Sequence, residues 1–219
     1  MPIRSMLPCL FVLCLTPDAV TASRNPAALC DDAAHLAAQN SNTPLPVLLA
    51  ITRVETGRSA AQGLQPWPWT INHAGTGHWF DTASEAVAAA ETALTEGSGN
   101  LDIGCFQLNH RWHAENFVSL EQMFDPEINA RYAADFLSDL YREMGDWPSA
   151  VAAYHSRSAG PAASYLAKIE TTLADLGAQP EPAVARANTY PLLQSGARGS
   201  GGSLVPRLAA SHPLIGAAP

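Results

Sequence analysis

Hydrophobic and polar positions along most of the chain follow the period of an α-helix. The clearest segment is 126–143, where apolar residues fall on one face and Asp125 precedes the segment as a capping residue. The apolar residues of that face are Ile128, Tyr132, Phe136, Leu137 and Leu140. The same spacing predicts shorter helices over residues 31–39, 44–56, 82–95, 149–156 and 161–176. Gly57 is expected to end the helix 44–56 as a C′ glycine.

Residues 66–81 (PWPWTINHAGTGHWFD) break the helical pattern. Aromatic and polar residues alternate there around a glycine-containing turn at 72–77, which predicts a β-hairpin. Strands and helices do not alternate along the chain, so a parallel sheet is excluded. We therefore expect a mainly α fold with one small β-hairpin.

Both ends of the chain differ from this central part. Arg4, an apolar run over residues 6–15 and small residues before Ser23 predict a secretory signal peptide at residues 1–22. Residues 178–219 contain six Pro and five Gly but no Phe or Trp, which predicts a disordered tail. Two apolar islands in that tail are either docking motifs or neutral linker. The folded domain is then expected to span residues 23–177, with no membrane span after signal cleavage.

The net charge of the chain excludes nucleic acid as a partner. With 20 acidic and 12 basic residues, the formal net charge is −8, the wrong sign for a surface that binds nucleic acid.

Export also changes the interpretation of the cysteines, because signal removal leaves only Cys30 and Cys105 in an oxidising compartment. A disulfide between them is the main prediction. A buried free thiol, or Cys105 as a nucleophile beside His110 or His155, is the alternative.

Glu55 is the first candidate for chemistry. It lies in the last turn of the otherwise apolar helix 44–56, where the helix dipole and apolar neighbours both raise the pKa of a carboxyl. A carboxyl that stays protonated near neutral pH is suited to act as the general acid in cleaving a glycosidic bond. A solvated surface glutamate is the alternative interpretation.

Two further segments carry candidate residues. In the segment 104–109 (GCFQLN), Gly104 permits a tight turn, while Phe106 and Leu108 are expected to anchor it in the core. Gln107 and Asn109 alternate with these anchors and are expected to offer amides for sugar recognition. Later in the chain, the helix 149–156 brings the phenol of Tyr154 to its polar end.

In this order, the three segments resemble the signatures of the SLT family of lytic transglycosylases, which have a goose-lysozyme-like (α+β) fold. The resemblance extends roughly over residues 30–177. It implies cleavage of the MurNAc-β-1,4-GlcNAc bond of peptidoglycan in the periplasm, with 1,6-anhydro-MurNAc ends and no cofactor. It further implies Glu55 as the single acid and base, and a tyrosine, Tyr154, that hydrogen-bonds near it. The implied substrate-binding residues are Thr56, Gly104, Phe106, Gln107, Asn109, Tyr154 and His155.

The sequence departs from the family pattern at three places. Thr56 follows the glutamate where Ser is common, and His155, Ser156 and Arg157 stand where the family has Asn, a small residue and Gly. The third departure is a long interval between the first two segments, which contains Trp67, Trp69 and Trp79. These indoles either form an aromatic wall of the cleft that stacks on sugar rings or hold the hairpin on the domain.

Other roles for the polar residues are less well supported. The candidates for a second carboxylate are Asp81, Asp102 and Glu115, of which Asp102 lies nearest the glycine turn. His110 and His113 lack the third ligand that a zinc site needs, so no metal site is expected.

Two other functions remain possible from the sequence, namely a hydrolytic muramidase and a non-catalytic glycan-binding adaptor. The aromatic insert, the variant tyrosine motif and the tail resemble flagellum-associated members of the family. We therefore expect a role in opening the wall for a flagellum or a secretion apparatus, with a rod or scaffold protein bound through the tail.

Overall fold

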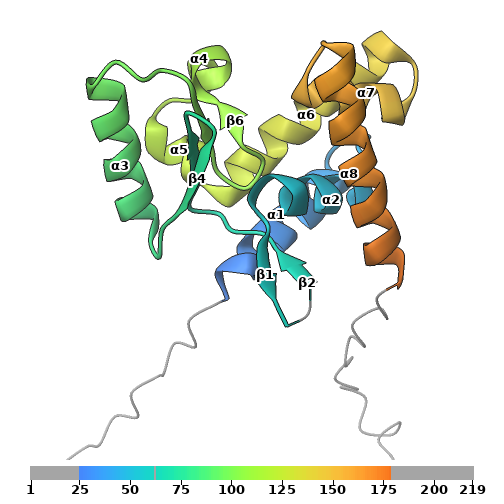
Figure 1. Ribbon diagram of the computed structural model, residues 1–219, viewed down its shortest axis with the longest axis horizontal. Coiled ribbons are helices and arrows are strands. Elements are labelled where there is room, and N and C mark those ends of the chain that lie inside the picture. Colours follow the sequence, from blue (N-terminus) through green and yellow to red (C-terminus); the bar gives the residue numbers. More distant parts are fainter. Residues whose placement is uncertain (1–24, 62, 179–219) are drawn as a thin grey trace, which may run out of the picture. The chain divides into compact units, whose positions relative to one another are not determined.

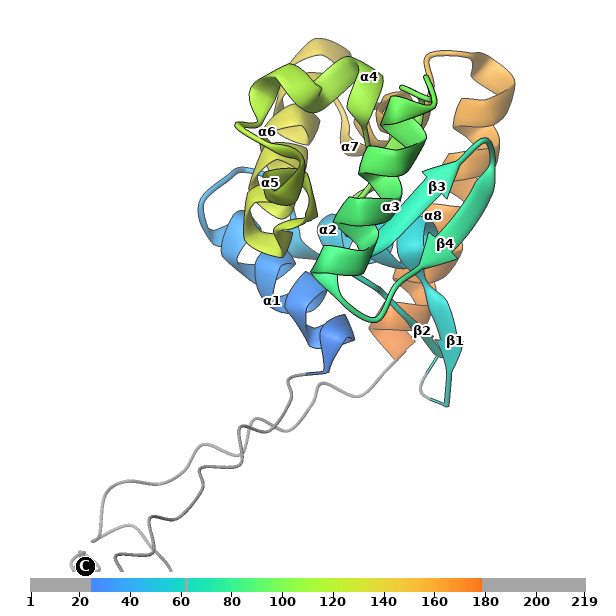
Figure 2. The ribbon, with the colours of Figure 1, turned by 90° about the vertical axis from the view of Figure 1, so that its left-hand side faces the viewer.

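The computed structural model describes residues 25–61 and 63–178, which form eight α-helices and two small antiparallel sheets (Figures 1 and 2). The helices are α1 (Pro26–Gln39), α2 (Leu45–Thr56), α3 (Ala83–Thr95), α4 (His110–His113), α5 (Leu120–Phe124), α6 (Pro126–Met144), α7 (Trp147–His155) and α8 (Ala159–Ala178). A 3₁₀ turn, η1 (Ala114–Asn116), follows α4. The expected signal peptide and all but the first residue of the expected tail lie outside the described residues.

The predicted helices form where the sequence places them. Thr82 caps α3 in a reciprocal capping box with Glu85, and Asp125 caps α6 by accepting a hydrogen bond from the Ile128 amide. Gly145 ends α6 in the left-handed region with φ of 86°. The mainly α fold is therefore confirmed, and no helix in the described part of the chain is long and apolar enough to cross a bilayer.

Gly57 ends α2 for a different reason from the expected one. A C′ glycine usually adopts a left-handed backbone, but φ of Gly57 is −59°. A Cβ atom at this position would lie 2.2 Å from the Arg53 carbonyl oxygen. Glycine is therefore required by close approach of the chain to the end of α2, not by backbone conformation.

The expected hairpin is confirmed as β3 (Thr70–His73) paired with β4 (Thr76–Trp79), and Ala74 and Gly75 form its turn with positive φ. The expectation of a single β element is wrong. Strands β5 (Leu101–Ile103) and β6 (Leu108–Asn109) extend the sheet in the order β4-β3-β5-β6. A second hairpin joins β1 (Arg58–Ala60) to β2 (Gly63–Gln65). Strands of two or three residues are too short to show a period in the sequence.

The core is centred on α2 and α6. In Figure 1 the larger sheet and α3 lie on one side of α2, and α7 and α8 lie on the other. The buried face of α6 is rotated from the expected one, because small residues face the core there. It consists of Asn129, Ala130, Ala133, Ala134, Leu137 and Leu140, while Ile128, Tyr132 and Phe136 are only half-buried.

The predicted disulfide is confirmed. Cys30 of α1 bonds to Cys105, which follows β5, with their Cα atoms 5.7 Å apart. Both side chains are buried, and the bond closes a loop of 75 residues. On the chain-entropy model a loop of this length stabilises the fold by roughly 4 kcal/mol. It also fixes the turn after β5, where the candidate site lies, to α1.

Candidate active site

Glu55 occupies the last turn of α2, which is packed between α1 and α8. The residue is half-buried, and the Tyr165 hydroxyl donates a hydrogen bond to its Oε1 over 2.6 Å. Tyr165 comes from α8 and is only 3 % exposed, so its position is fixed by the core. Sequence reasoning missed Tyr165, which lies 110 residues from Glu55 and in no motif used above.

The environment of Glu55 gives it an unusual acidity. Its pKa is raised to about 7, mainly because burial disfavours the charged form, and the negative charge of Asp102 adds to this effect. The hydrogen bond from Tyr165 and the positive charge of Lys168 lower the pKa and offset part of the rise. The expected rise is therefore confirmed, with desolvation as its leading cause.

Asp102 and His155 complete a polar group around this carboxyl, which we name the Glu55 cluster (Glu55, Asp102, His155 and Tyr165). Asp102 lies in the middle of β5, and its Oδ1 accepts a 2.7 Å hydrogen bond from the Asn109 amide. Burial raises the pKa of Asp102, whereas the hydrogen bond from Asn109 and the charge of His155 lower it.

The imidazole of His155 lies at the end of α7 and stacks flat on the Tyr165 ring, with centroids 4.5 Å apart and an interplanar angle of 4°. Burial lowers the pKa of His155, and Lys168 acts in the same direction. Near neutral pH the imidazole is therefore mostly uncharged. Helix α7, which carries Tyr154, therefore also places His155 against Tyr165, the residue that bonds to Glu55.

Tyr154 forms its hydrogen bond near Glu55 but not to the carboxyl itself. Its hydroxyl donates to the Phe106 carbonyl oxygen over 2.7 Å, and the tyrosine that bonds to Glu55 is Tyr165. Tyr154 is nevertheless close enough to Glu55 for the carboxylate charge to raise the pKa of its phenol. Its observed role is to tie α7 to the turn at residues 104–107.

That turn is held by an asparagine that the sequence did not single out. Asn129 of α6 is fully buried; its Oδ1 accepts a hydrogen bond from the Phe106 amide and its Nδ2 donates to the Ile103 and Met123 carbonyl oxygens. A Cβ atom on Gly104, whose φ is 80°, would lie 2.7 Å from this side-chain nitrogen. Gly104 is therefore required by both conformation and space.

The two amides expected to bind sugars are partly engaged within the protein. Gln107 also has a positive φ, of 47°, and its Nε2 donates to the Thr70 and Gly104 carbonyl oxygens. Asn109 donates to Asp102 and to Asn100. Both residues are half-buried. Asn109 contacts Asp102 of the Glu55 cluster, and Gln107 contacts Thr70 of β3. Their role in substrate binding stays a prediction.

Three of the expected substrate-binding residues are buried, namely Thr56, Gly104 and Phe106. The Thr56 hydroxyl donates to the Thr52 carbonyl oxygen and accepts a hydrogen bond from the Trp67 amide. The Phe106 side chain is wholly enclosed in the core. In this conformation these residues hold the end of α2 and the glycine turn, and their role in substrate binding stays a prediction.

The tryptophans of the hairpin region differ in exposure. Trp67 and Trp69 are half-buried and meet edge to face, and the Trp67 indole donates to the Phe80 carbonyl oxygen. Trp79 is 44 % exposed, and its indole donates to the carbonyl oxygen of Thr56, the residue after Glu55. Of the three, Trp79 therefore combines an open ring face with a direct link to the end of α2.

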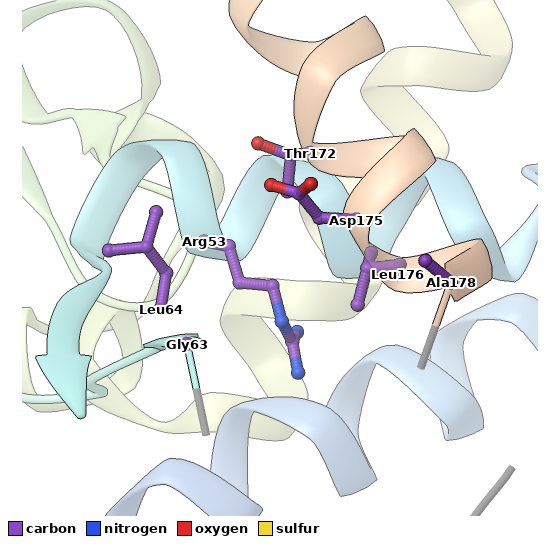
Figure 3. Close-up of a pocket in the computed structure, with 7 residues that line it drawn as sticks. All are labelled: Arg53, Gly63, Leu64, Thr172, Asp175, Leu176 and Ala178. Carbon is purple, nitrogen blue, oxygen red and sulfur yellow. The ribbon is translucent and has the colours of Figure 1, made fainter. Parts of the chain in front are cut away.

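Two cavities lie away from Glu55. One of about 310 Å³ lies between α2, β2 and the end of α8, where Arg53 reaches toward α1 and pairs with Asp31 (Figure 3). The other, of about 520 Å³, lies between α3 and α5 beside Trp69. Across the described ranges no group of three His, Cys, Asp or Glu side chains is arranged as a metal site. His113 instead shares a hydrogen bond with the Tyr132 hydroxyl.

Comparison with known proteins gives one family match. The model of the Transglycosylase SLT domain matches residues 72–168, a range that begins in β3 and ends in α8. It includes Asp102, the turn at residues 104–107, His155 and Tyr165, whereas Glu55 precedes it. No curated protein and no solved structure matches the chain. The match covers less than half of the chain, so it supports a relation to the transglycosylase SLT family over those residues.

Proposed function

We propose that the chain is a periplasmic lytic transglycosylase that cleaves the MurNAc-β-1,4-GlcNAc bond and leaves 1,6-anhydro-MurNAc ends. The observation that carries this proposal is the state of Glu55, a half-buried carboxyl with a pKa of about 7 that accepts a hydrogen bond from Tyr165. The family match supplies peptidoglycan as the substrate class. A carboxyl with this pKa is able both to donate and to accept a proton at neutral pH.

The reaction needs one acid and base acting twice. Protonated Glu55 gives its proton to the glycosidic oxygen, the bond from C1 to that oxygen breaks, and the GlcNAc hydroxyl leaves. The substrate N-acetyl group stabilises the positive charge that develops at C1. The Glu55 carboxylate then takes the proton of the C6 hydroxyl of the MurNAc ring, and the C6 oxygen bonds to C1. Glu55 ends protonated as it began, and no water is consumed.

Tyr165 and His155 prepare Glu55 for this double role. Tyr165 binds Oε1, which fixes the carboxyl plane and leaves Oε2 to exchange the proton. The imidazole stacked on the phenol restricts the ring that makes this bond. Burial favours the neutral form and raises the pKa of Glu55, whereas the Tyr165 hydrogen bond favours the charged form and limits the rise, so the pKa lies at about 7.

Sugar binding around Glu55 is assigned to the accessible groups among the expected residues. His155 belongs to the Glu55 cluster, Asn109 bonds to its Asp102, and Gln107 lies in the adjoining glycine turn. Trp79 offers an indole face beside the end of α2. An indole face matches the apolar face of a pyranose, while amides pair with hydroxyl and N-acetyl groups.

Glu55→Gln tests this function most directly, because glutamine keeps the size of the side chain and its ability to accept a hydrogen bond from Tyr165. The variant is expected to lose release of soluble fragments from purified peptidoglycan. Retained cleavage by the folded variant contradicts the mechanism. A non-catalytic adaptor, which has no use for a carboxyl at this position, is favoured instead if the unsubstituted chain binds peptidoglycan without cleaving it.

A hydrolytic muramidase is the second candidate, favoured by one observation. Asp102 is the acidic residue whose charge raises the pKa of Glu55, so a second carboxylate lies near the first. Hydrolysis would use it to activate water and would leave a reducing end. Mass spectrometry of the released fragments separates the two reactions, because the anhydro product is lighter by one water.

We also propose that the cleavage opens the wall for a flagellum or a secretion apparatus, with residues 178–219 binding a rod or scaffold protein. The charge distribution supports this, since residues 178–219 carry three basic residues and one acidic residue beside a strongly acidic domain. Removal of 179–219 is expected to abolish capture of that partner and to spare cleavage of isolated peptidoglycan. Equal capture by the shortened chain contradicts the docking role.

A further inference from the structure

Trp112 is the most exposed of the five tryptophans of the chain. The residue is 70 % exposed, on the outward face of α4 beside Arg111, which is exposed as well. An indole carries a large flat apolar surface, and leaving it in water has a free-energy cost that burial in the core would remove. Neither the family signatures nor the proposed chemistry at Glu55 uses this residue.

The backbone that carries Trp112 is held firmly on both sides. Before it, the Asn109 side chain accepts a hydrogen bond from the Arg111 amide and donates one to Asp102. After it, the His113 ring packs on Phe136 at a centroid distance of 5.1 Å and shares a hydrogen bond with the Tyr132 hydroxyl. The indole is therefore displayed from a fixed support, which reduces the conformational entropy lost when a ligand binds.

This support is continuous with the candidate active site. Strand β6 ends at Asn109 and leads directly into α4, and Asn109 is bonded to Asp102 of the Glu55 cluster. On the other side, Phe136 lies between the ring of His113 and the ring of Tyr154, at 5.1 and 5.6 Å. A polymer bound at Glu55 extends beyond the bond that is cleaved, and α4 directly follows β6, whose Asn109 bonds to the Glu55 cluster.

We propose that Trp112 forms a secondary glycan-binding site, in which its indole face stacks on a pyranose ring of the peptidoglycan strand. The inference rests on the proposed function for the identity of the polymer. The exposed neighbours Arg111 and Glu115 offer hydrogen-bonding groups for sugar hydroxyl and N-acetyl groups beside a single aromatic face. Asn116 adds its Oδ1, since its Nδ2 donates to the His113 carbonyl oxygen and the Tyr132 hydroxyl. Arg111 also offers a positive charge to the carboxylates of the peptide stems.

A folded protein partner fits this surface less well. Protein interfaces have an apolar core formed by several residues. In the segment 110–118, the exposed large apolar residue besides Trp112 is Val118, which is 89 % exposed. One indole surrounded by polar and charged side chains instead has the composition of a carbohydrate-stacking site. Arg111 beside an indole also suits an anionic lipid surface, which the experiment below includes as a separate arm.

The test measures binding of the full chain to purified insoluble peptidoglycan by co-sedimentation, with Glu55→Gln as the common background to prevent cleavage. Trp112→Ala is expected to weaken binding by about three- to tenfold, as the loss of one aromatic contact implies. Trp112→Phe is expected to keep most of the affinity, because a smaller ring still stacks. Val118→Ser is the matched control: it removes exposed apolar surface from the same segment without removing a ring, and it is expected to bind as the background does.

Each contrary result overturns the inference. Binding of Trp112→Ala equal to that of the background excludes the site, as does equal weakening by Val118→Ser, which would indicate general hydrophobic adhesion. A background protein that does not sediment with peptidoglycan also overturns it. Trp112-dependent binding to anionic phospholipid vesicles, with peptidoglycan binding unaffected, would assign the surface to a membrane. Cleavage by the unsubstituted chain is measured in parallel, so that failure of the proposed function is seen separately from failure of this site.

Discussion

Tyr165→Phe gives the sharpest test of how the fold sets the acidity of Glu55. The substitution removes the hydroxyl that donates to Glu55 Oε1 over 2.6 Å and keeps the ring that packs in the core and under His155. That hydrogen bond lowers the pKa of Glu55, so its loss must raise the pKa above the native value of about 7.

The size of the shift follows from the strength of the bond. A hydrogen bond to a charged group contributes about 1.5 kcal/mol or more, and about 1.4 kcal/mol corresponds to one pKa unit. We therefore expect a rise of about one unit. Because the first step needs a protonated Glu55, the alkaline limb of the kcat/KM profile should move to higher pH by the same amount. The maximal rate should fall as well, since the carboxyl plane is no longer fixed.

The assay is release of anhydro fragments from purified peptidoglycan across a pH range that brackets neutrality. Tyr154→Phe is the matched control, because it removes a buried hydroxyl that bonds to the Phe106 carbonyl oxygen and not to Glu55. Its alkaline limb should stay at the native position. An unchanged limb in folded Tyr165→Phe, or a shift to lower pH, would refute the assignment of Glu55 as the acid or of Tyr165 as its partner.

Four other variants have defined outcomes. Asp102→Asn removes a charge that raises the pKa of Glu55, so the alkaline limb should move to lower pH, opposite to the effect of Tyr165→Phe, with anhydro products retained. Glu55 has a folded pKa above its unfolded value, so the native protein loses stability as pH rises from 4.5 to about 7. Glu55→Gln should remove this loss, so its melting temperature should match that of the parent below this range and exceed it increasingly as pH rises through the range. Replacing Cys30 and Cys105 by Ser should lower the free energy of unfolding by roughly 4 kcal/mol in a denaturant titration, and reductant should then have no further effect. Gly57→Ala should destabilise the fold in the same titration, because its Cβ would meet a backbone carbonyl oxygen at 2.2 Å.

Local patterns predict the helices of this protein well because their signals lie close together in the chain. The capping residues Thr82 and Asp125 sit three positions before their partners, and the hairpin turn at Ala74 and Gly75 is two residues long. The larger sheet was not predictable in this way. Strands β5 and β6 are too short to show a period, and β5 pairs with β3 across the whole of α3.

The buried face of α6 shows a related limit. Hydrophobic spacing favours large apolar residues, and it pointed to Ile128 and Phe136 as core residues. The helix instead buries alanines and Asn129, because α1 and α7 approach it closely and Asn129 must bind the turn at residues 104–107. Close packing of helices selects small residues, and a one-dimensional hydrophobic pattern does not register such contacts.

The sequence alone pointed to the residues proposed to carry the chemistry, Glu55 at the end of an apolar helix and a glycine turn, and to a pair of cysteines in a chain expected to be exported. These follow from neighbours in the chain, the helix dipole and the redox compartment. Tertiary structure decided what surrounds them. Tyr165 bonds to Glu55, whereas Tyr154 bonds to the Phe106 carbonyl oxygen. Asp102 and His155 belong to the Glu55 cluster, and the side chains of Thr56 and Phe106 are buried. The reason is physical: a pKa is set by burial and by charges within a few ångströms, and those neighbours come from α8, α7 and β5, segments tens of residues away in the chain.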